Sequence, residues 1–336
     1  MSRVMDELQR SIYVDRFRLA FHTQQGTAFQ DWFVRLAGHA FGSDFEEVRP
    51  YGSQGDLKCD GRHVSTKSVF QCYAPYLMKD VELIAKVDED FHGARAHWAA
   101  EMAKWIFVHN DGRGLPPKAV QYIDGLRTAH APIGIETWSE PELLKLAMAL
   151  DLPALQALFG YAPSIAIVDR LVMADLLPII DALQRQEPNA EDPPLTPPSP
   201  EKLEKNALSE ESGLLLRIGR RKSSLVDTFF RKSPRPDLGE RIAEAFRTRY
   251  AELKAYDLPA DTIFKHLQDH AGMNGEPKRQ GAALAVLAYF FDINQSISRV
   301  RFSLTRRICR DSRSACRKTM PANWITPRLK RSEYAR

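Results

Sequence analysis

Acidic, amide and cationic residues gather in one short stretch of the chain, GDLKCDGRHVSTKSVFQCYAP. Asp56, Lys58 and Asp60 stand two residues apart, and the apolar run that follows carries Gln71. Metal-dependent phosphodiester hydrolysis needs these types: a carboxylate and a second oxygen that hold Mg²⁺ or Mn²⁺ against the phosphate, and a cation that stabilises developing charge. The stretch therefore predicts half of a hydrolytic metal site, with the ion held by Asp60 and Gln71.

Strand periodicity explains how these residues meet. Side chains on a strand repeat every two residues, so Gln71 and Tyr73 share one face. Asp60 begins the preceding strand arm and is expected to be exposed there, with little contribution to folding. Gln30 and Asp31, on the helix before the hairpin, are expected to reach the same edge.

Each residue also has a purely structural explanation. Asp56 and Asp60, flanked by glycines, are typical turn formers. Tyr73 has the character of a half-buried strand aromatic. Gln71 is harder to explain in this way, because a buried amide without partners costs about 1–3 kcal/mol.

Nucleic-acid contacts are predicted from local positions only. Gln30, Arg62 and Lys67 surround the hairpin and could touch phosphates, although scattered cations are usually just solvated. The net charge of +4 gives no support, because residues 299–336 carry twelve Lys or Arg against two acidic residues and leave residues 1–298 at about −6. A nucleic-acid hypothesis therefore rests on local clusters.

Composition is that of a soluble protein with two folded units, at 336 residues, 44% hydrophobic and 27% charged. No run approaches the roughly 18 apolar residues of a membrane span, and the charged N-terminus has no signal-peptide core. A cytoplasmic location with no membrane contact is expected. The four cysteines form no CxxC pair and have no histidine at ligand spacing, so a zinc site is not predicted.

Hydrophobic periodicity predicts the order helix, three strands, helix, strand, helix, strand, helix in the first half. The expected strands lie at 45–51, on two arms around Gly61, at 104–109 and at 133–138, and Ser139 with Glu142 forms a capping box before the next helix. A further helix is expected at 164–183. This alternation predicts an α/β core with helices flanking a mixed sheet.

A composition change divides the chain. Residues 186–212 contain six prolines and almost no large apolar residues, which is typical of an extended linker. The predicted parts are a first domain at 1–184, the linker at 185–212, a small all-helical domain at 213–298 and a basic, disordered tail at 299–336.

At these residues the sequence resembles the PD-(D/E)xK nuclease superfamily, in the variant whose second motif begins with glutamine. GDLKCDG followed by VFQCY matches the motifs in order and spacing over roughly residues 13–140. The resemblance implies a restriction-endonuclease-like αβββαβ core and Mg²⁺-dependent cleavage of DNA. Asp60 and Gln71 would then bind the metal, and Asp56, Lys58 and Tyr73 would complete the catalytic set.

The forms FQCYAP and AVLAYFFDI are similar to the nuclease-bearing components of bacterial three-component conflict systems built around an ABC ATPase. This narrower resemblance implies an effector in defence against phage or mobile elements. Its implied partners are DNA and other components of a complex, including an ABC-type ATPase, and an oligomeric state is expected.

One position departs from the motif. Tyr73 stands where the motif has lysine, and a phenol with an ordinary pKa near 10 gives no fixed positive charge at neutral pH. Lys58, two residues from both aspartates, is the predicted replacement. The alternative is an inactive nuclease fold kept as a DNA-binding adaptor.

Overall fold

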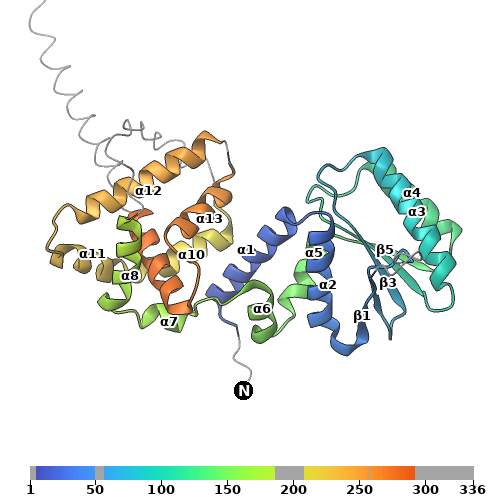
Figure 1. The fold of residues 1–336 in the computed structure, drawn as a ribbon, viewed down its shortest axis with the longest axis horizontal. Coiled ribbons are helices and arrows are strands. Elements are labelled where there is room, and N and C mark those ends of the chain that lie inside the picture. The colour runs from blue at the N-terminus through green and yellow to red at the C-terminus, as the bar shows by residue number, and fades with distance from the viewer. Residues whose placement is uncertain (1–4, 50–56, 186–207, 257, 292–336) are drawn as a thin grey trace, which may run out of the picture.

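The computed structural model describes residues 5–49, 57–185, 208–256 and 258–291. Figure 1 shows a sheet-containing part and an all-helical part on either side of helix α1 (Glu7–Thr23). Asp56, most of the predicted linker and the basic tail lie outside the described residues. Within the described part of the chain, no helix is both long and apolar enough to cross a membrane.

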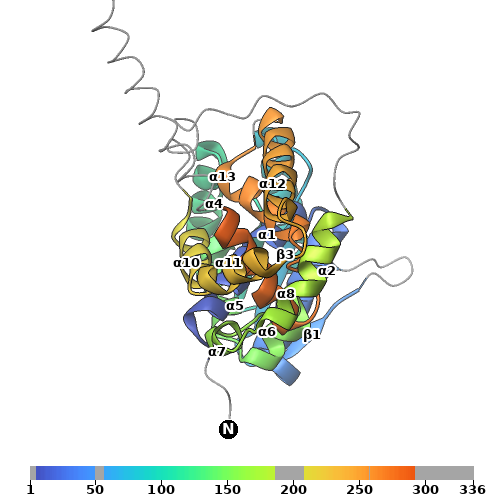
Figure 2. The same cartoon turned by 90° about the vertical axis from the view of Figure 1, so that its left-hand side faces the viewer.

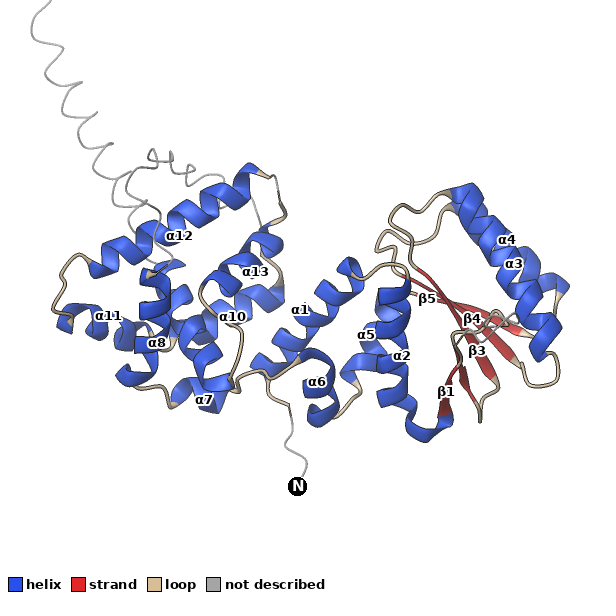
Figure 3. Ribbon diagram, in the orientation of Figure 1, coloured by secondary structure: helices blue, strands red, loops and turns tan. Residues whose placement is uncertain are grey.

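A five-stranded sheet, in the order β1-β2-β3-β4-β5, builds the first part (Figure 3). The first three strands are antiparallel, and β3, β4 and β5 are parallel. The strands are β1 (Phe45–Glu47), β2 (Gly61–His63), β3 (Ser68–Tyr73), β4 (Lys104–His109) and β5 (Gly134–Trp138).

Helices cover both faces of this sheet. The core on one face contains residues of α1, α2 (Thr27–Phe41) and α5 (Glu140–Met148). The core on the other face contains residues of α3 (Asp80–Trp98) and α4 (Pro117–Ala129). From α2 to α5 the elements follow the predicted order, so the mixed α/β character is confirmed. The Ser139 and Glu142 capping box is also present, with the Ser139 backbone N–H donating to Glu142 Oε2 at 2.9 Å.

The hairpin between β2 and β3 turns later than predicted. Gly61 lies inside β2, and the chain reverses at residues 64–67, where Lys67 has a positive φ of 51°. A side chain at residue 61 has no room, because its Cβ would lie 2.4 Å from Phe45 Cζ. A larger residue here would have to displace the Phe45 ring, which is consistent with a glycine inside the strand, and the polar residues after it form the turn.

The second part is helical, which confirms the predicted helical C-terminal region. It contains α7 (Ile165–Asp169), α8 (Met173–Gln184), α10 (Glu210–Arg220), α11 (Ser223–Lys232), α12 (Leu238–Ala255), α13 (Ala260–His270) and a helix over residues 277–291. Residues 282–288 of that last helix are all buried, so it forms the centre of the bundle. The single helix predicted at 164–183 is two helices, and α10 already begins inside the predicted linker.

Helix α1 contributes to both parts. Its first half, with Leu8, Ile12 and Tyr13, lies in one core with α7, α8 and the C-terminal helices, whereas Phe17 and Phe21 lie in the core of the sheet. Figure 2 views the molecule from the helical end, with α8, α10 and α11 in front of α1. Helix α1 connects the two parts, together with α6 (Leu152–Phe159), which contacts it. The predicted domain boundary at residue 184 stays a prediction.

The crossing of α10 over the helix at 277–291 gives a stability prediction. A Cβ on Gly219 would lie 2.7 Å from the backbone oxygen of Leu284 and from Ala288 Cβ. Gly219→Ala is therefore expected to lower the free energy of unfolding by about 1–3 kcal/mol in a denaturant titration. Gly213→Ala, on the same helix with open space around it, is the control and should be neutral or slightly stabilising. Equal stabilities of the two variants would contradict this packing.

Cutting the predicted linker gives a second test. The proline-rich composition predicts that protease cuts first between residues 185 and 212. Because α1 shares a buried core with the C-terminal helices, the two fragments are expected to stay associated. Gel filtration of the nicked protein under native conditions should give one peak that separates into two bands in denaturing gels, whereas two native peaks would contradict the shared core.

Candidate active site

Asp60, directly before β2, lies beside Gln71 of β3. The Asp60 backbone N–H donates to the Phe70 carbonyl oxygen at 2.9 Å, and the Cys72 backbone N–H donates to Asp60 Oδ2 at 2.6 Å. These two bonds bracket Gln71. The structure therefore brings together the two residues that the sequence predicts as metal ligands.

The expectation that Asp60 is exposed is wrong. Only 2% of the residue is accessible, because its carboxylate turns back onto the backbone of β3. Burial raises the pKa of the Cys72 thiol well above its ordinary value, and the Asp60 carboxylate raises it further. Cys72 is therefore a thiol at neutral pH, and Asp60 supports the fold as well as the candidate site.

Gln71 carries the polar feature most in need of an explanation. The residue is 4% exposed, and its Oε1 has no hydrogen-bond partner among the described residues. A buried acceptor oxygen beside a carboxylate fits a cation, since Mg²⁺ binds through one or two carboxylates and completes its shell with water and phosphate. No three His, Cys, Asp or Glu side chains of the described ranges are placed to hold a metal, so an ion here would depend on few protein ligands.

Tyr73 follows Gln71 on the same face of β3. It is partly buried, and burial raises the pKa of its phenol, with Glu82 and Asp90 raising it further. His109 is its register partner on β4, and burial lowers the pKa of that imidazole to about 4. Both side chains are neutral at pH 7, so neither supplies the positive charge of the missing lysine.

Lys58 is held as a cation close to this face. Its backbone is left-handed, with φ of 59°, and its Nζ contacts Glu89 and lies 3.4 Å from Asp90 Oδ1. The hydrogen bond with Glu89 is the main cause that raises the Lys58 pKa. Its stem crosses Gly93, where an added Cβ would lie 2.5 Å from Lys58 Cγ. The ammonium is therefore anchored on α3.

Asp90 was not predicted from the sequence. It is fully buried, Lys86 Nζ lies 2.8 Å from its Oδ1, and its Oδ2 has no hydrogen-bond partner among the described residues. Burial raises the pKa of this carboxyl, against the lowering effect of Lys86 and Lys58. The sequence did hold a signal, because Asp90 shares the helical spacing of the buried residues Leu83 and Val87.

The predicted nucleic-acid residues lie at different places. Gln30 is on the first turns of α2, whose N-cap Gly26 donates its N–H to the Ala74 carbonyl oxygen, directly beyond β3. Arg62 lies 4.6 Å over the Trp98 ring. Lys67 is at the other end of β3, four residues or roughly 13 Å from Gln71. Helix α2 packs on the sheet face opposite to the one that carries Val69, Gln71 and Tyr73, so the structure brings neither Gln30 nor Lys67 to the candidate site.

Comparison with known proteins bears on the C-terminal part. Residues 174–296 match the family model for C-terminal domain 10 of the ABC-three component (ABC-3C) systems. This match supports membership of the chain in such a multi-component system. No curated protein and no solved structure matches the chain.

Proposed function

We propose that this chain is a component of an ABC-three component system, in which it is a metal-dependent DNA endonuclease that acts as the effector in bacterial defence. The observation that carries the proposal is the placement of Asp60 beside Gln71, whose buried oxygen lacks a partner among the described residues. The order of α2, three strands, α3 and β4 is that of the αβββαβ core implied by the motif resemblance. The match to an ABC-3C domain supports the defence role and a multi-component assembly, for which an ABC-type ATPase and DNA are the proposed partners.

Each residue has a proposed role in phosphodiester hydrolysis. Asp60 and Gln71 would hold Mg²⁺ or Mn²⁺, which polarises the scissile phosphate and activates water when bound. Lys58 would stabilise the charge that develops on the phosphate, because its ammonium is fixed by Glu89 and Asp90. Asp56 keeps its predicted supporting role, and Tyr73 would border the substrate as a neutral phenol.

A second candidate is a non-catalytic adaptor with the same fold. Two observations favour it: Tyr73 replaces the motif lysine, and the Lys58 ammonium is already bound by Glu89 and Asp90. Such a protein would bind DNA through the site without cutting it.

Cleavage and binding assays separate the two candidates. Purified full-length protein is incubated with plasmid DNA and with RNA, in Mg²⁺ or Mn²⁺, alone and with the products of neighbouring genes. The nuclease proposal expects nicked or linear DNA that depends on the metal and is lost with EDTA. DNA binding without cleavage in every condition would overturn it in favour of the adaptor.

Variants at Lys58 and Tyr73 test which of the two residues takes the role of the missing motif lysine. Lys58→Ala is expected to lower the initial rate of plasmid nicking. The expected loss of transition-state stabilisation is about 2–3 kcal/mol. Tyr73→Phe should change the rate much less, since a neutral phenol supplies no charge. Glu89→Gln, which removes one Lys58 partner at an exposed position, is the control for altered ion pairing. An inactive Tyr73→Phe with an active Lys58→Ala would assign catalysis to the phenol instead.

A further inference from the structure

Two buried acceptor oxygens that have no partner in the described ranges lie in the layer between the sheet and α3. One is Gln71 Oε1 and the other is Asp90 Oδ2. Gln71 alternates with Val69 and Tyr73, which belong to the core on the α3 side, and Asp90 lies on the face of α3 that supplies Phe91 to the same core. The two oxygens therefore belong to one layer.

Charged contacts connect Asp90 to the candidate site. Lys58 stands two residues before Asp60, and its Nζ lies 3.4 Å from Asp90 Oδ1. Asp90 also raises the pKa of the Tyr73 phenol. Asp90 is thus within electrostatic reach of both ends of the predicted motif. Asp90 therefore lies near Lys58 and Tyr73, which are predicted site residues, and not in a separate part of the core.

The existing partners of Asp90 leave one oxygen unused. Lys86 and Lys58 both approach Oδ1, at 2.8 Å and 3.4 Å, and none of the described residues bonds Oδ2. A fully buried carboxylate is stable only when it is paired and hydrogen-bonded. An amide oxygen and an ionised carboxylate oxygen are both acceptors, so they cannot satisfy each other, and a group that satisfies both must be a cation or a hydrogen-bond donor.

A protein donor in this layer is the competing explanation. Trp105 Nε1 and His109 Nδ1 are also buried without partners among the described residues. Their register partners on β3 are Val69 and Tyr73, the inward-facing positions on either side of Gln71. Neither ring nitrogen bonds Gln71 Oε1 or Asp90 Oδ2 in this structure, because both oxygens lack partners in the described part of the chain.

We infer that Asp90 is a third oxygen ligand, with Asp60 and Gln71, of a divalent cation held between β3 and α3. This inference rests on the proposed function, because it assigns a further ligand to the same site. One amide and two carboxylate oxygens match the hard-ligand preference of Mg²⁺ and Mn²⁺. Lys86 and the cation would both bind the Asp90 carboxylate, so they are expected to compete for it.

Cation binding can be measured without any cleavage. Full-length protein, free of DNA, is titrated with MnCl₂ by isothermal calorimetry and by Mn²⁺ electron paramagnetic resonance. Asp90→Asn keeps the shape of the side chain and is expected to weaken Mn²⁺ affinity roughly tenfold or more. Lys86→Gln should strengthen it. Asp88→Asn, at a half-exposed carboxylate two residues away that contacts His92, is the matched control and should bind Mn²⁺ like the parent.

Thermal melts in EDTA show whether each variant is folded before titration. If Asp90→Asn is unstable, Asp90→Glu serves as the second variant, and altered Mn²⁺ affinity is again expected. Parent-like Mn²⁺ binding by folded Asp90 variants, or no Mn²⁺ binding by the parent, would overturn the inference. Mn²⁺ binding that depends on Asp90, without DNA cleavage in any condition, would leave this inference standing and reject the nuclease proposal.

Discussion

Asp60→Asn is expected to abolish detectable plasmid cleavage while the protein stays folded. The change removes the negative charge that would hold the metal but keeps an amide oxygen that can accept the Cys72 backbone N–H, as Oδ2 does at 2.6 Å. Cleavage is measured as the rate of supercoiled plasmid loss in Mg²⁺, and folding by the midpoint of thermal unfolding. Asp124→Asn, at an exposed carboxylate on α4, should match the parent in both.

Asp60→Ala is expected to lose stability in addition to activity. It leaves the Cys72 N–H without its acceptor in a buried environment, which costs about 1–3 kcal/mol. The comparison separates the two roles of the residue: the asparagine variant reports on charge, and the alanine variant on charge and fold together. Retained cleavage by Asp60→Asn would remove this carboxylate from the mechanism.

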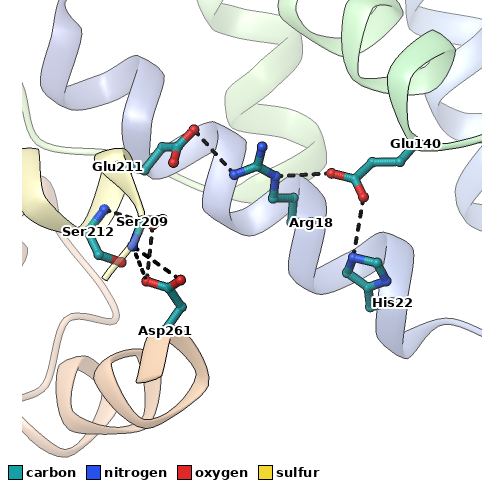
Figure 4. A network of polar contacts seen from close by, with 7 residues as sticks. All are labelled: Arg18, His22, Glu140, Ser209, Glu211, Ser212 and Asp261. Atoms are coloured by element: carbon teal, nitrogen blue, oxygen red, sulfur yellow. Dashed lines mark hydrogen bonds and ion pairs between the residues drawn. The ribbon is translucent and has the colours of Figure 1, made fainter. Parts of the chain in front are cut away.

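The second large effect concerns the contact between the two parts. Arg18 on α1 binds Glu140 of α5 at 3.0 Å and Glu211 of α10 at 3.2 Å, and Asp261 of α13 bonds Ser209 close by (Figure 4). Asp15, one turn before Arg18, faces Glu211, Asp261 and Lys265 as well. Burial, with the two acidic neighbours, raises the pKa of Asp15 to about 7, against Lys265 and Arg18.

This shift makes stability depend on pH in a defined direction. The unfolded chain releases the Asp15 proton near pH 3.8 and the folded chain near 7, so the folded state binds more protons between these values. The free energy of unfolding should therefore fall as pH rises from about 4 to 7, by up to about 4 kcal/mol from this group before solvent screening. Above that range the penalty is fully present and constant.

Asp15→Asn is the variant that isolates the effect. It should unfold close to the parent at pH 4.5 and at a higher temperature than the parent at pH 8, measured as thermal midpoints across this range. Asp124→Asn is again the control and should follow the pH curve of the parent. Parallel curves for parent and Asp15→Asn would show that Asp15 titrates normally in the folded protein.

The sequence by itself determined the alternation of helices and strands, because periods of 3.6 and 2 are local properties of the chain. The order from α2 to α5 and the capping box at Ser139 followed from this, as did the helical C-terminal part. Strand periodicity predicted that Asp60 and Gln71 belong to one site, but their direct pairing depends on a turn at residues 64–67 that the sequence pattern did not locate. The turn was misplaced to Gly61, because glycine occurs in turns and also where a neighbouring ring, here Phe45, leaves no room for a side chain.

Only the tertiary structure decided which charges meet. Asp90 joins the candidate site because α3 packs across the sheet, and no sequence spacing connects residue 90 to residues 58 and 71. The burial of Asp60 likewise depends on a bond to a strand twelve residues away. Helix α1 carries an ordinary apolar pattern, and its membership of two cores follows from where α10 and the helix at 277–291 dock, because long-range contacts leave no periodic trace in the chain that makes them.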